Sequence, residues 1–268
     1  MSLVTTRAVV LQTYRYSETS KVVRLATRDL GVQSAIAKGA LRPKSRFGAG
    51  LELLSEGMAQ LYFRETRELH TLGAFDLTNL RRELAADVGR FTAAAALAQV
   101  MLKMAPPAPL APAYDVLIAG LDALAAAPTD RTDATAVRAI WRLVAVLGFA
   151  PSLTACVRDG AAVEPVGDAV LFSIAEGGAY CRRCAPAPAA SPPPARLPPQ
   201  AYRDLVALND PRVDLPGLDA AHAAAHRRLV ARFVRYHLGE AGPLSALDSW
   251  ERRAWLSPSP TPLSSAAS

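Results

Sequence analysis

The sequence predicts an α+β protein with an N-terminal β-barrel, a helical domain and a cysteine-bearing, zinc-ribbon-like β-hairpin inserted in the helical part. Short runs rich in β-branched residues fill roughly the first 75 residues and are separated by turn signals. Beyond residue 80 the apolar residues recur at helical spacing, and all three cysteines lie within residues 151–190. A chain of 268 residues with 51% hydrophobic composition can bury a core in two or more such modules.

Five strands are expected in the first domain, residues 1–80. They are predicted at Ala8–Tyr14, Lys21–Thr27, Val32–Ala37, Met58–Phe63 and Glu68–Leu72. Five short strands joined in places by tight turns are typical of a small closed barrel, of which the Greek-key OB-fold is one form. The OB-fold is a common platform for nucleic acids, although a fold alone does not establish a function.

The loop after the third of these strands concentrates positive charge. Gly39, Pro43 and Gly48 disfavour a helix there and keep the side chains on an exposed loop. Such a loop suits a polyanion, most often a phosphate backbone, whereas composition alone also allows a merely solvated loop. Four cations without an intervening acid form this basic loop: Lys38, Arg42, Lys44 and Arg46. Three more cations of the strand block are expected as secondary DNA contacts: Arg15, Lys21 and Arg24.

Three helices are expected in residues 81–150, the first part of the helical domain. Proline-rich segments end the first two, and Gly148 closes the third, because glycine is favoured just past a helix end. The helices are predicted at Glu83–Met104, Tyr114–Ala126 and Thr135–Leu147. Trp141 lies on the apolar side of the third helix, which favours a packing anchor over a platform for base stacking.

Residues 151–190 carry the cysteines in an arrangement that resembles a metal site. Cys181 and Cys184 form a C-x-x-C pair, and Cys156 and Asp159 have the same spacing 25 residues earlier. Two such pairs can present four ligands to one tetrahedral zinc ion, although a site of three cysteines and one aspartate is unusual and should be weaker than four cysteines. A hairpin that folds by packing alone, without metal, remains open. In either case the role is structural.

The second part of the helical domain, residues 195–256, follows an Ala/Pro-rich connector at Pro186–Pro199 and contains helices at Ala201–Leu208 and His222–Leu238. At about 100° per residue, the arginines of the last helix share one side, and its apolar residues, Tyr236 included, occupy the other. This cationic face predicts a second phosphate-contacting surface, with an ordinary solvated face as the alternative. The arginines concerned are Arg227, Arg228, Arg232 and Arg235.

Composition limits the remaining options. The net charge is +6 and the pI is about 9.5, which favours anionic partners. The sequence shows neither a secretory signal peptide nor an apolar run near the ~20 residues that span a bilayer, so a cytoplasmic protein without membrane contact is expected. Common phosphate-loop, dinucleotide, serine-hydrolase and metalloprotease motifs are absent, which indicates a protein that is not an enzyme. Residues 257–268 are expected to form a disordered tail.

Three N-terminal segments resemble the bacterial recombination mediator family RecO: Tyr16–Val23, Thr27–Gly31 and Ala37–Gly48. The order of strand block, helices, cysteine hairpin and basic helix is similar to that family up to about residue 250. The resemblance implies an OB-fold, a helical domain and a four-cysteine zinc element, in which Asp159 here replaces the second cysteine.

The same resemblance implies a function in DNA repair. Members of this family bind single- and double-stranded DNA, anneal complementary strands, and work with RecR to load recombinase onto DNA covered by single-strand-binding protein. A nucleoid-associated location and a groove for the C-terminal tail of single-strand-binding protein are implied as well. The alternatives are an RNA-binding or transcription-associated adaptor with a zinc ribbon and a generic barrel, and an enzyme with an unrecognised site.

Overall fold

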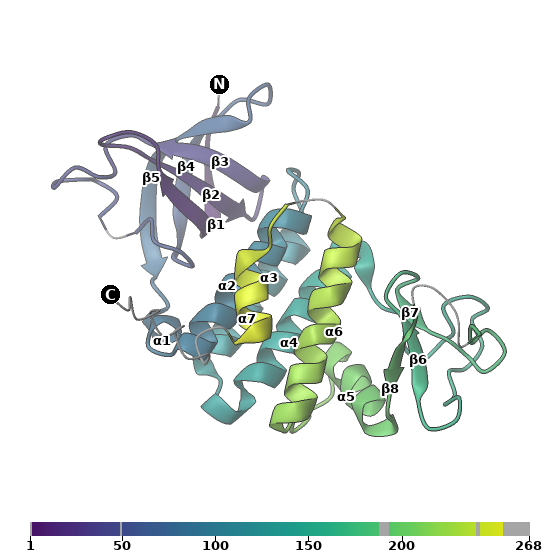
Figure 1. The fold of residues 1–268 in the computed structure, drawn as a ribbon. Helices are drawn as coiled ribbons and strands as arrows, with labels where there is room; N and C mark the ends of the chain where they lie inside the picture. Colours follow the sequence, from purple (N-terminus) through teal and green to yellow (C-terminus); the bar gives the residue numbers. More distant parts are fainter. Residues whose placement is uncertain (1, 49, 188–192, 240–241, 254–268) are drawn as a thin grey trace, which may run out of the picture.

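The structure is a computed structural model and describes residues 2–48, 50–187, 193–239 and 242–253. Figure 1 shows a β-barrel at one end, a helical domain in the middle and a small β-rich module at the opposite end. The tail expected at residues 257–268 lies outside the described residues. Among the described residues, no helix has the length and apolar character needed to cross a membrane.

The N-terminal strands close into the expected barrel, in the order β1-β2-β3-β5-β4. Their bounds are β1 Ser2–Arg15, β2 Lys21–Thr27, β3 Gly31–Ala37, β4 Glu56–Phe63 and β5 Leu69–Asn79. The five predicted strands are confirmed, and the parallel pairing of β3 with β5 is what closes the sheet. Alternate residues point inward, so Val10 of β1 and Leu25 of β2 pair in register and are both fully buried.

The helical domain is built mainly from seven elements in the described residues. These are α1 Arg82–Ala85, α2 Val88–Met104, α3 Ala111–Ala126, α4 Thr132–Val144, α5 Pro199–Asn209, α6 Ala220–Leu238 and α7 Ser245–Arg252. The single helix predicted at Glu83–Met104 is wrong, because the helix is interrupted between α1 and α2. The Asp87 carboxylate accepts a hydrogen bond of 2.8 Å from the Arg90 amide and caps α2. Helix α7 was not expected as a separate element.

The core of this domain confirms the packing role of Trp141. Its side chain is fully buried, and the Phe233 ring of α6 meets it edge-on at 4.9 Å between centroids. Gly148 lies within the short π-type turn Ala145–Phe149 that follows α4. Its φ of +97° is non-helical, as expected for the residue that ends this helical segment.

The cysteine module is a three-stranded sheet in the order β7-β6-β8. Its strands are β6 Val170–Ser173, β7 Gly178–Ala179 and β8 Ala195–Leu197. The strand expected between the cysteine pairs is β6. The Pro186–Pro199 segment is not simply a connector, because its residues 195–197 pair with β6, while residues 188–192 lie outside the described part of the chain.

The barrel is held on the helical domain by apolar contacts and a buried ion-pair network. The Glu56 carboxylate accepts hydrogen bonds from Arg81 at 2.6 Å, from Arg7 at 2.9 Å and from the Tyr114 hydroxyl of α3 at 3.3 Å. Burial alone would raise the pKa of Glu56, but its hydrogen bonds to Arg7 and Arg81 lower it below the usual range. Arg81 also binds Asp122 of α3, so this network fixes the orientation of the barrel.

Candidate nucleic-acid interface and metal centre

The basic loop, residues 38–48, is a series of tight turns anchored at its end. Consecutive i to i+3 backbone hydrogen bonds run from Gly39 to Ser45, and the Leu41 amide donates to the Thr19 carbonyl of the β1–β2 turn at 2.9 Å. Phe47 is 3% exposed and inserts into the barrel core. The loop is therefore held firmly against the barrel surface and against the neighbouring turn.

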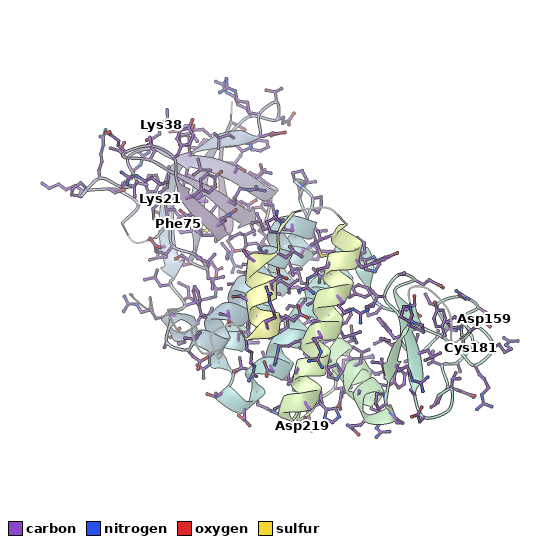
Figure 2. All side chains as sticks on the ribbon, viewed as in Figure 1. Lys21, Lys38, Phe75, Asp159, Cys181 and Asp219 are labelled. Carbon is purple, nitrogen blue, oxygen red and sulfur yellow. The ribbon has the colours of Figure 1, made fainter. Side chains whose placement is uncertain are left out.

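The four cations of the basic loop all lie on the surface. Lys38, Arg42, Lys44 and Arg46 are exposed, and within the described part of the chain none of them forms an ion pair. Arg46 extends over the Phe47 ring, with 5.1 Å between the guanidinium carbon and the ring centroid. Figure 2 shows Lys38 on the part of the barrel that points away from the helices. The loop thus offers uncompensated positive charge to solvent.

The three secondary contacts differ in availability. Arg15 is exposed and donates to the carbonyls of its own turn, Ser17 and Glu18. The Lys21 ammonium is only 20% exposed and pairs with Glu52 at 3.1 Å. Arg24 is half-buried. Only Arg15 therefore extends the positive surface of the basic loop to the same degree.

Helix α6 does not present a wholly cationic face. The expectation that Arg227 is solvent-exposed is wrong, because its side chain is 6% exposed and its guanidinium lies 2.8 Å from Asp133 of α4. Burial lowers the pKa of Arg227, which Asp133 partly offsets. This arginine is therefore a packing element of the helical domain.

Arg235, the last of the four arginines of α6, is also neutralised. Arg235 is half-buried and forms ion pairs with Asp248, at 2.6 Å, and with Glu251, both on α7. Arg228 and Arg232 are exposed as expected, and neither has an ion-pair partner among the described residues. Half of the predicted α6 surface is therefore available for phosphate contacts.

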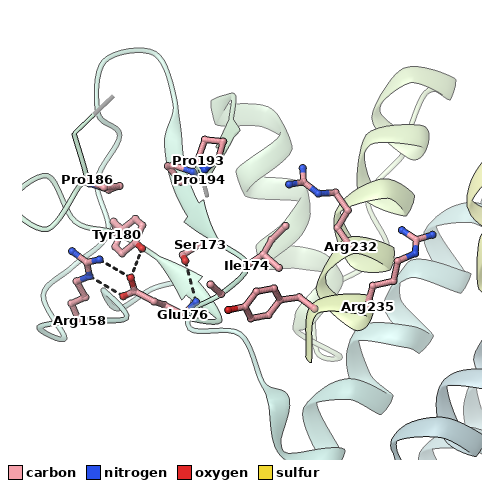
Figure 3. Close-up of a pocket in the computed structure, with 12 residues that line it drawn as sticks. Arg158, Ser173, Ile174, Glu176, Tyr180, Pro186, Pro193, Pro194, Arg232 and Arg235 are labelled. Carbon is pink, nitrogen blue, oxygen red and sulfur yellow. Dashed lines mark hydrogen bonds and ion pairs between the residues drawn. The ribbon is translucent and has the colours of Figure 1, made fainter. Parts of the chain in front are cut away.

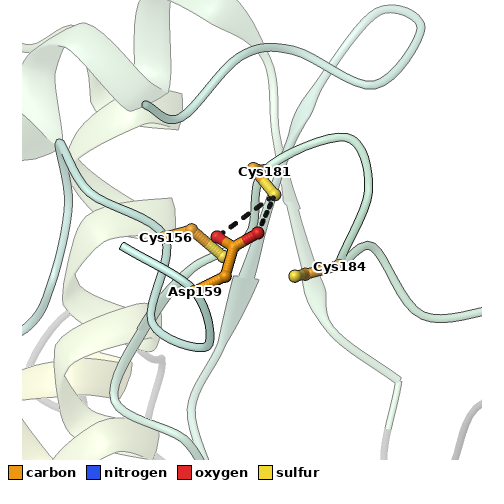
Figure 4. A group of neighbouring side chains, drawn as sticks. All are labelled: Cys156, Asp159, Cys181 and Cys184. Carbon is orange, nitrogen blue, oxygen red and sulfur yellow. Dashed lines mark hydrogen bonds between the residues drawn. The ribbon is translucent and has the colours of Figure 1, made fainter. Parts of the chain in front are cut away.

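The cysteine module brings its four predicted ligands together. The sulfur atoms of Cys156, Cys181 and Cys184 and a carboxylate oxygen of Asp159 all lie within 4.8 Å of one another. Figure 4 shows the four side chains gathered around one point. Both Asp159 oxygens are 3.6 Å from the Cys181 sulfur. Ligands at about 2.3 Å from a tetrahedral zinc ion would be roughly 3.8 Å apart, so these residues fit a structural zinc site.

The surroundings of Asp159 suit a metal ligand. Its Oδ1 accepts a hydrogen bond from the Ala161 amide, and Arg183 pairs with Oδ2 at 3.0 Å, so the carboxylate is oriented by two outer partners. The Ala161 amide, followed by the thiols, lowers the pKa of Asp159 well below its usual range. Burial and the nearby carboxylate raise the pKa of the Cys184 thiol to about 12, which disfavours the thiolate. A bound cation would stabilise the thiolate.

Comparison with known families agrees with this arrangement. Residues 1–81 match the family described as Recombination protein O N terminal, and residues 85–246 match Recombination protein O C terminal. The chain belongs to the RecO family. It is therefore a DNA-binding protein of DNA repair and recombination with an N-terminal OB-fold, and the family resemblance seen in the sequence is confirmed.

Two features of this RecO-family chain were missed by reasoning from the sequence. Tyr236 was placed on the apolar side of α6, yet it is 54% exposed and borders a cavity next to the cysteine module. The acids that neutralise Arg227 and Arg235 lie on α4 and α7. No local pattern could reveal them, because the partners are contributed by distant segments.

Proposed function

We propose that this protein binds single- and double-stranded DNA mainly through the basic loop of its barrel. The observation that carries the proposal is the exposure of four cations that no acid neutralises in the described structure. Each cation that meets a phosphate releases counterions, so affinity falls with rising salt. Phosphate contacts of this kind position the protein on DNA with little reading of sequence.

Exposed aromatic residues of the barrel support the capture of single strands. Tyr14 and Tyr16 are 49% and 60% exposed, next to Arg15 and the turn that contacts the basic loop. Bases stack on such rings regardless of their identity. A strand whose phosphates follow the loop can therefore place its bases on this side of the barrel.

Arg228 and Arg232 of α6 form the second, smaller surface. Two separate cationic regions can hold two strands, and neutralised phosphates lower the repulsion between complementary strands, which favours annealing. Arg227 and Arg235 are left out of this surface because their charges are already paired inside the helical domain. None of these steps requires bond chemistry, so the protein acts as a mediator and not as an enzyme.

The family membership supports partner proteins as well. In this proposal the chain works with RecR to load recombinase onto DNA that is covered by single-strand-binding protein, whose C-terminal tail docks on the helical domain. Zinc bound by the cysteine module would stabilise the fold of that module and would take no part in chemistry.

A strand-annealing assay tests the proposal. The purified protein should accelerate pairing of complementary DNA strands, both bare and coated with single-strand-binding protein, and addition of RecR should promote recombinase loading. A variant with Lys38, Arg42, Lys44 and Arg46 replaced by alanine should lose most of this activity. Competitor RNA separates the alternatives, because an RNA-binding adaptor would prefer RNA and would not accelerate DNA pairing.

A further inference from the structure

A cavity of about 450 Å³ opens between the cysteine module and α6. Figure 3 shows Arg158, Glu176 and Tyr180 on one side of it and Arg232 on the opposite side. Ile174 and the exposed ring of Tyr236 also line it. The cavity lies away from the basic loop in the fold, and Arg232 of the second proposed surface forms part of its wall.

The wall formed by the cysteine module is rigid and close to neutral. The Glu176 carboxylate accepts hydrogen bonds from Arg158 at 2.6 and 2.8 Å and from the Tyr180 hydroxyl at 2.6 Å. The Arg158 guanidinium in turn lies 4.9 Å over the Tyr180 ring. Arg158, with a smaller contribution from Tyr180, lowers the pKa of Glu176 to about 2, so this acceptor is ionised at neutral pH.

The wall formed by α6 carries an uncompensated cation. Arg235 also lines the cavity, but Asp248 and Glu251 neutralise it. Arg232 is exposed and has no ion-pair partner in the described residues. Beside it, Tyr236 is 54% exposed, which leaves an aromatic face next to a free guanidinium.

We propose that this cavity holds one unstacked nucleotide of a bound DNA strand, with its base against Tyr236 and Ile174 and its phosphate on Arg232. The inference rests on the DNA-binding function proposed above. The volume lies within the ~300–1,000 Å³ typical of small-ligand sites and is too small for a duplex. Stacking on an aromatic ring beside an arginine is a common way to hold an unpaired base.

The carboxylate in the cavity offers acceptor atoms to a nucleobase. Arg158 compensates the charge of Glu176, but the amino groups of cytosine, adenine and guanine can still donate hydrogen bonds to its oxygens. A nucleotide therefore matches both walls: an anionic phosphate meets Arg232, and neutral donors face Glu176.

The test uses the full-length protein and a DNA oligonucleotide containing 2-aminopurine, whose fluorescence reports base stacking. Three variants are compared: Tyr236→Ala, Tyr236→Phe and Arg232→Gln. Tyr236→Ala should weaken single-strand binding about tenfold without a change in salt dependence, because only a stacking face is lost. Tyr236→Phe keeps that face and should bind normally. Arg232→Gln should lower the magnitude of the single-strand slope of log affinity against log salt by about 0.7.

Two controls keep the outcomes distinct. Arg228→Gln removes an exposed arginine of α6 that does not line the cavity. It should lower the salt slope as Arg232→Gln does, but leave the 2-aminopurine signal of the saturated complex unchanged. The basic-loop alanine variant tests the proposed function by itself. If that variant loses DNA binding while Tyr236→Ala binds like the parent, the cavity proposal is overturned and DNA binding through the basic loop stands. The proposal would also be overturned if mononucleotides failed to displace the bound oligonucleotide while an acidic peptide bound in an Arg232-dependent way.

Discussion

The basic loop and helix α6 carry the same number of cations in the sequence, but the fold leaves different numbers of them exposed and unpaired. Each carries four cations within nine residues and no acid, at residues 38–46 and 227–235. The loop keeps all four on the surface, whereas α6 loses Arg227 and Arg235 to acids of α4 and α7. Local charge density therefore predicts available charge for a surface loop, but not for a helix that packs between other helices.

The largest effect expected from this comparison is on stability. Arg227→Ala removes one of two arginines that pair with Asp133, the other being Arg253, together with the packing of a buried side chain. It should lower the free energy of unfolding by about 2–4 kcal/mol. Urea denaturation measures the loss. Arg228→Ala, a change at the next residue on the exposed side, should cost less than about 0.5 kcal/mol. Similar stability of the two variants would contradict the difference between paired and free arginines.

The ion-pair network of Glu56, Arg7 and Arg81 between the barrel and the helical domain should make stability depend on pH. Because the pKa of Glu56 is lowered in the folded protein, its contribution to stability is complete above its unfolded pKa of about 4.3 and is lost as the pH falls towards its folded pKa. Glu56→Gln should lower stability at pH 7 by about 2–3 kcal/mol and flatten the acid limb of the pH profile. Thermal melts from pH 7 to 3 measure both effects. A variant with the same acid limb as the parent would remove Glu56 from this role.

The cysteine module provides a third case, since Asp159 neutralises Arg183. Asp159→Cys completes a four-cysteine site and should tighten zinc binding at least about tenfold, because a thiolate suits zinc better than a carboxylate does as the fourth ligand. Asp159→Asn is the matched control and should weaken it. Competition with a chromophoric chelator gives the affinities. Absence of zinc binding in both the parent and the cysteine variant would show that the module folds by packing alone.

The smallest effect belongs to single cations of the basic loop. Lys44→Gln should weaken single-strand binding only about two- to fivefold, with a decrease of about 0.7 in the salt slope, because one phosphate contact of several is lost. Arg46→Gln should behave similarly. Fluorescence anisotropy at several salt concentrations measures both. A single variant that abolished binding would indicate a specific contact and not a diffuse charged surface.

Period and turn signals were sufficient to predict most of the fold. Short β-branched runs around Val10 and Leu25, bounded by turn signals, located the barrel strands, and the C-x-x-C pair located the cysteine module together with its four candidate ligands. The strand in the proline-rich segment was missed because its hydrogen bonds depend on β6, not on its own composition.

The site was less accessible to sequence reasoning than the fold. The exposed cations of the basic loop could be identified because turns and a proline keep that segment on the surface and out of a packed helix. The buried state of Arg227 and the exposure of Tyr236 could not, since both depend on which helices pack against α6. Tertiary partners decide the availability of a side chain whenever its segment is part of a core.

The salt dependence of DNA binding tests the central claim most directly. The slope of log affinity against log salt is measured for the parent, for the variant with Lys38, Arg42, Lys44 and Arg46 replaced by alanine, and for Arg235→Gln. Four lost phosphate contacts should reduce the magnitude of the single-strand slope by about three, while the paired Arg235 should change it by well under one. An unchanged slope in the loop variant would contradict the account.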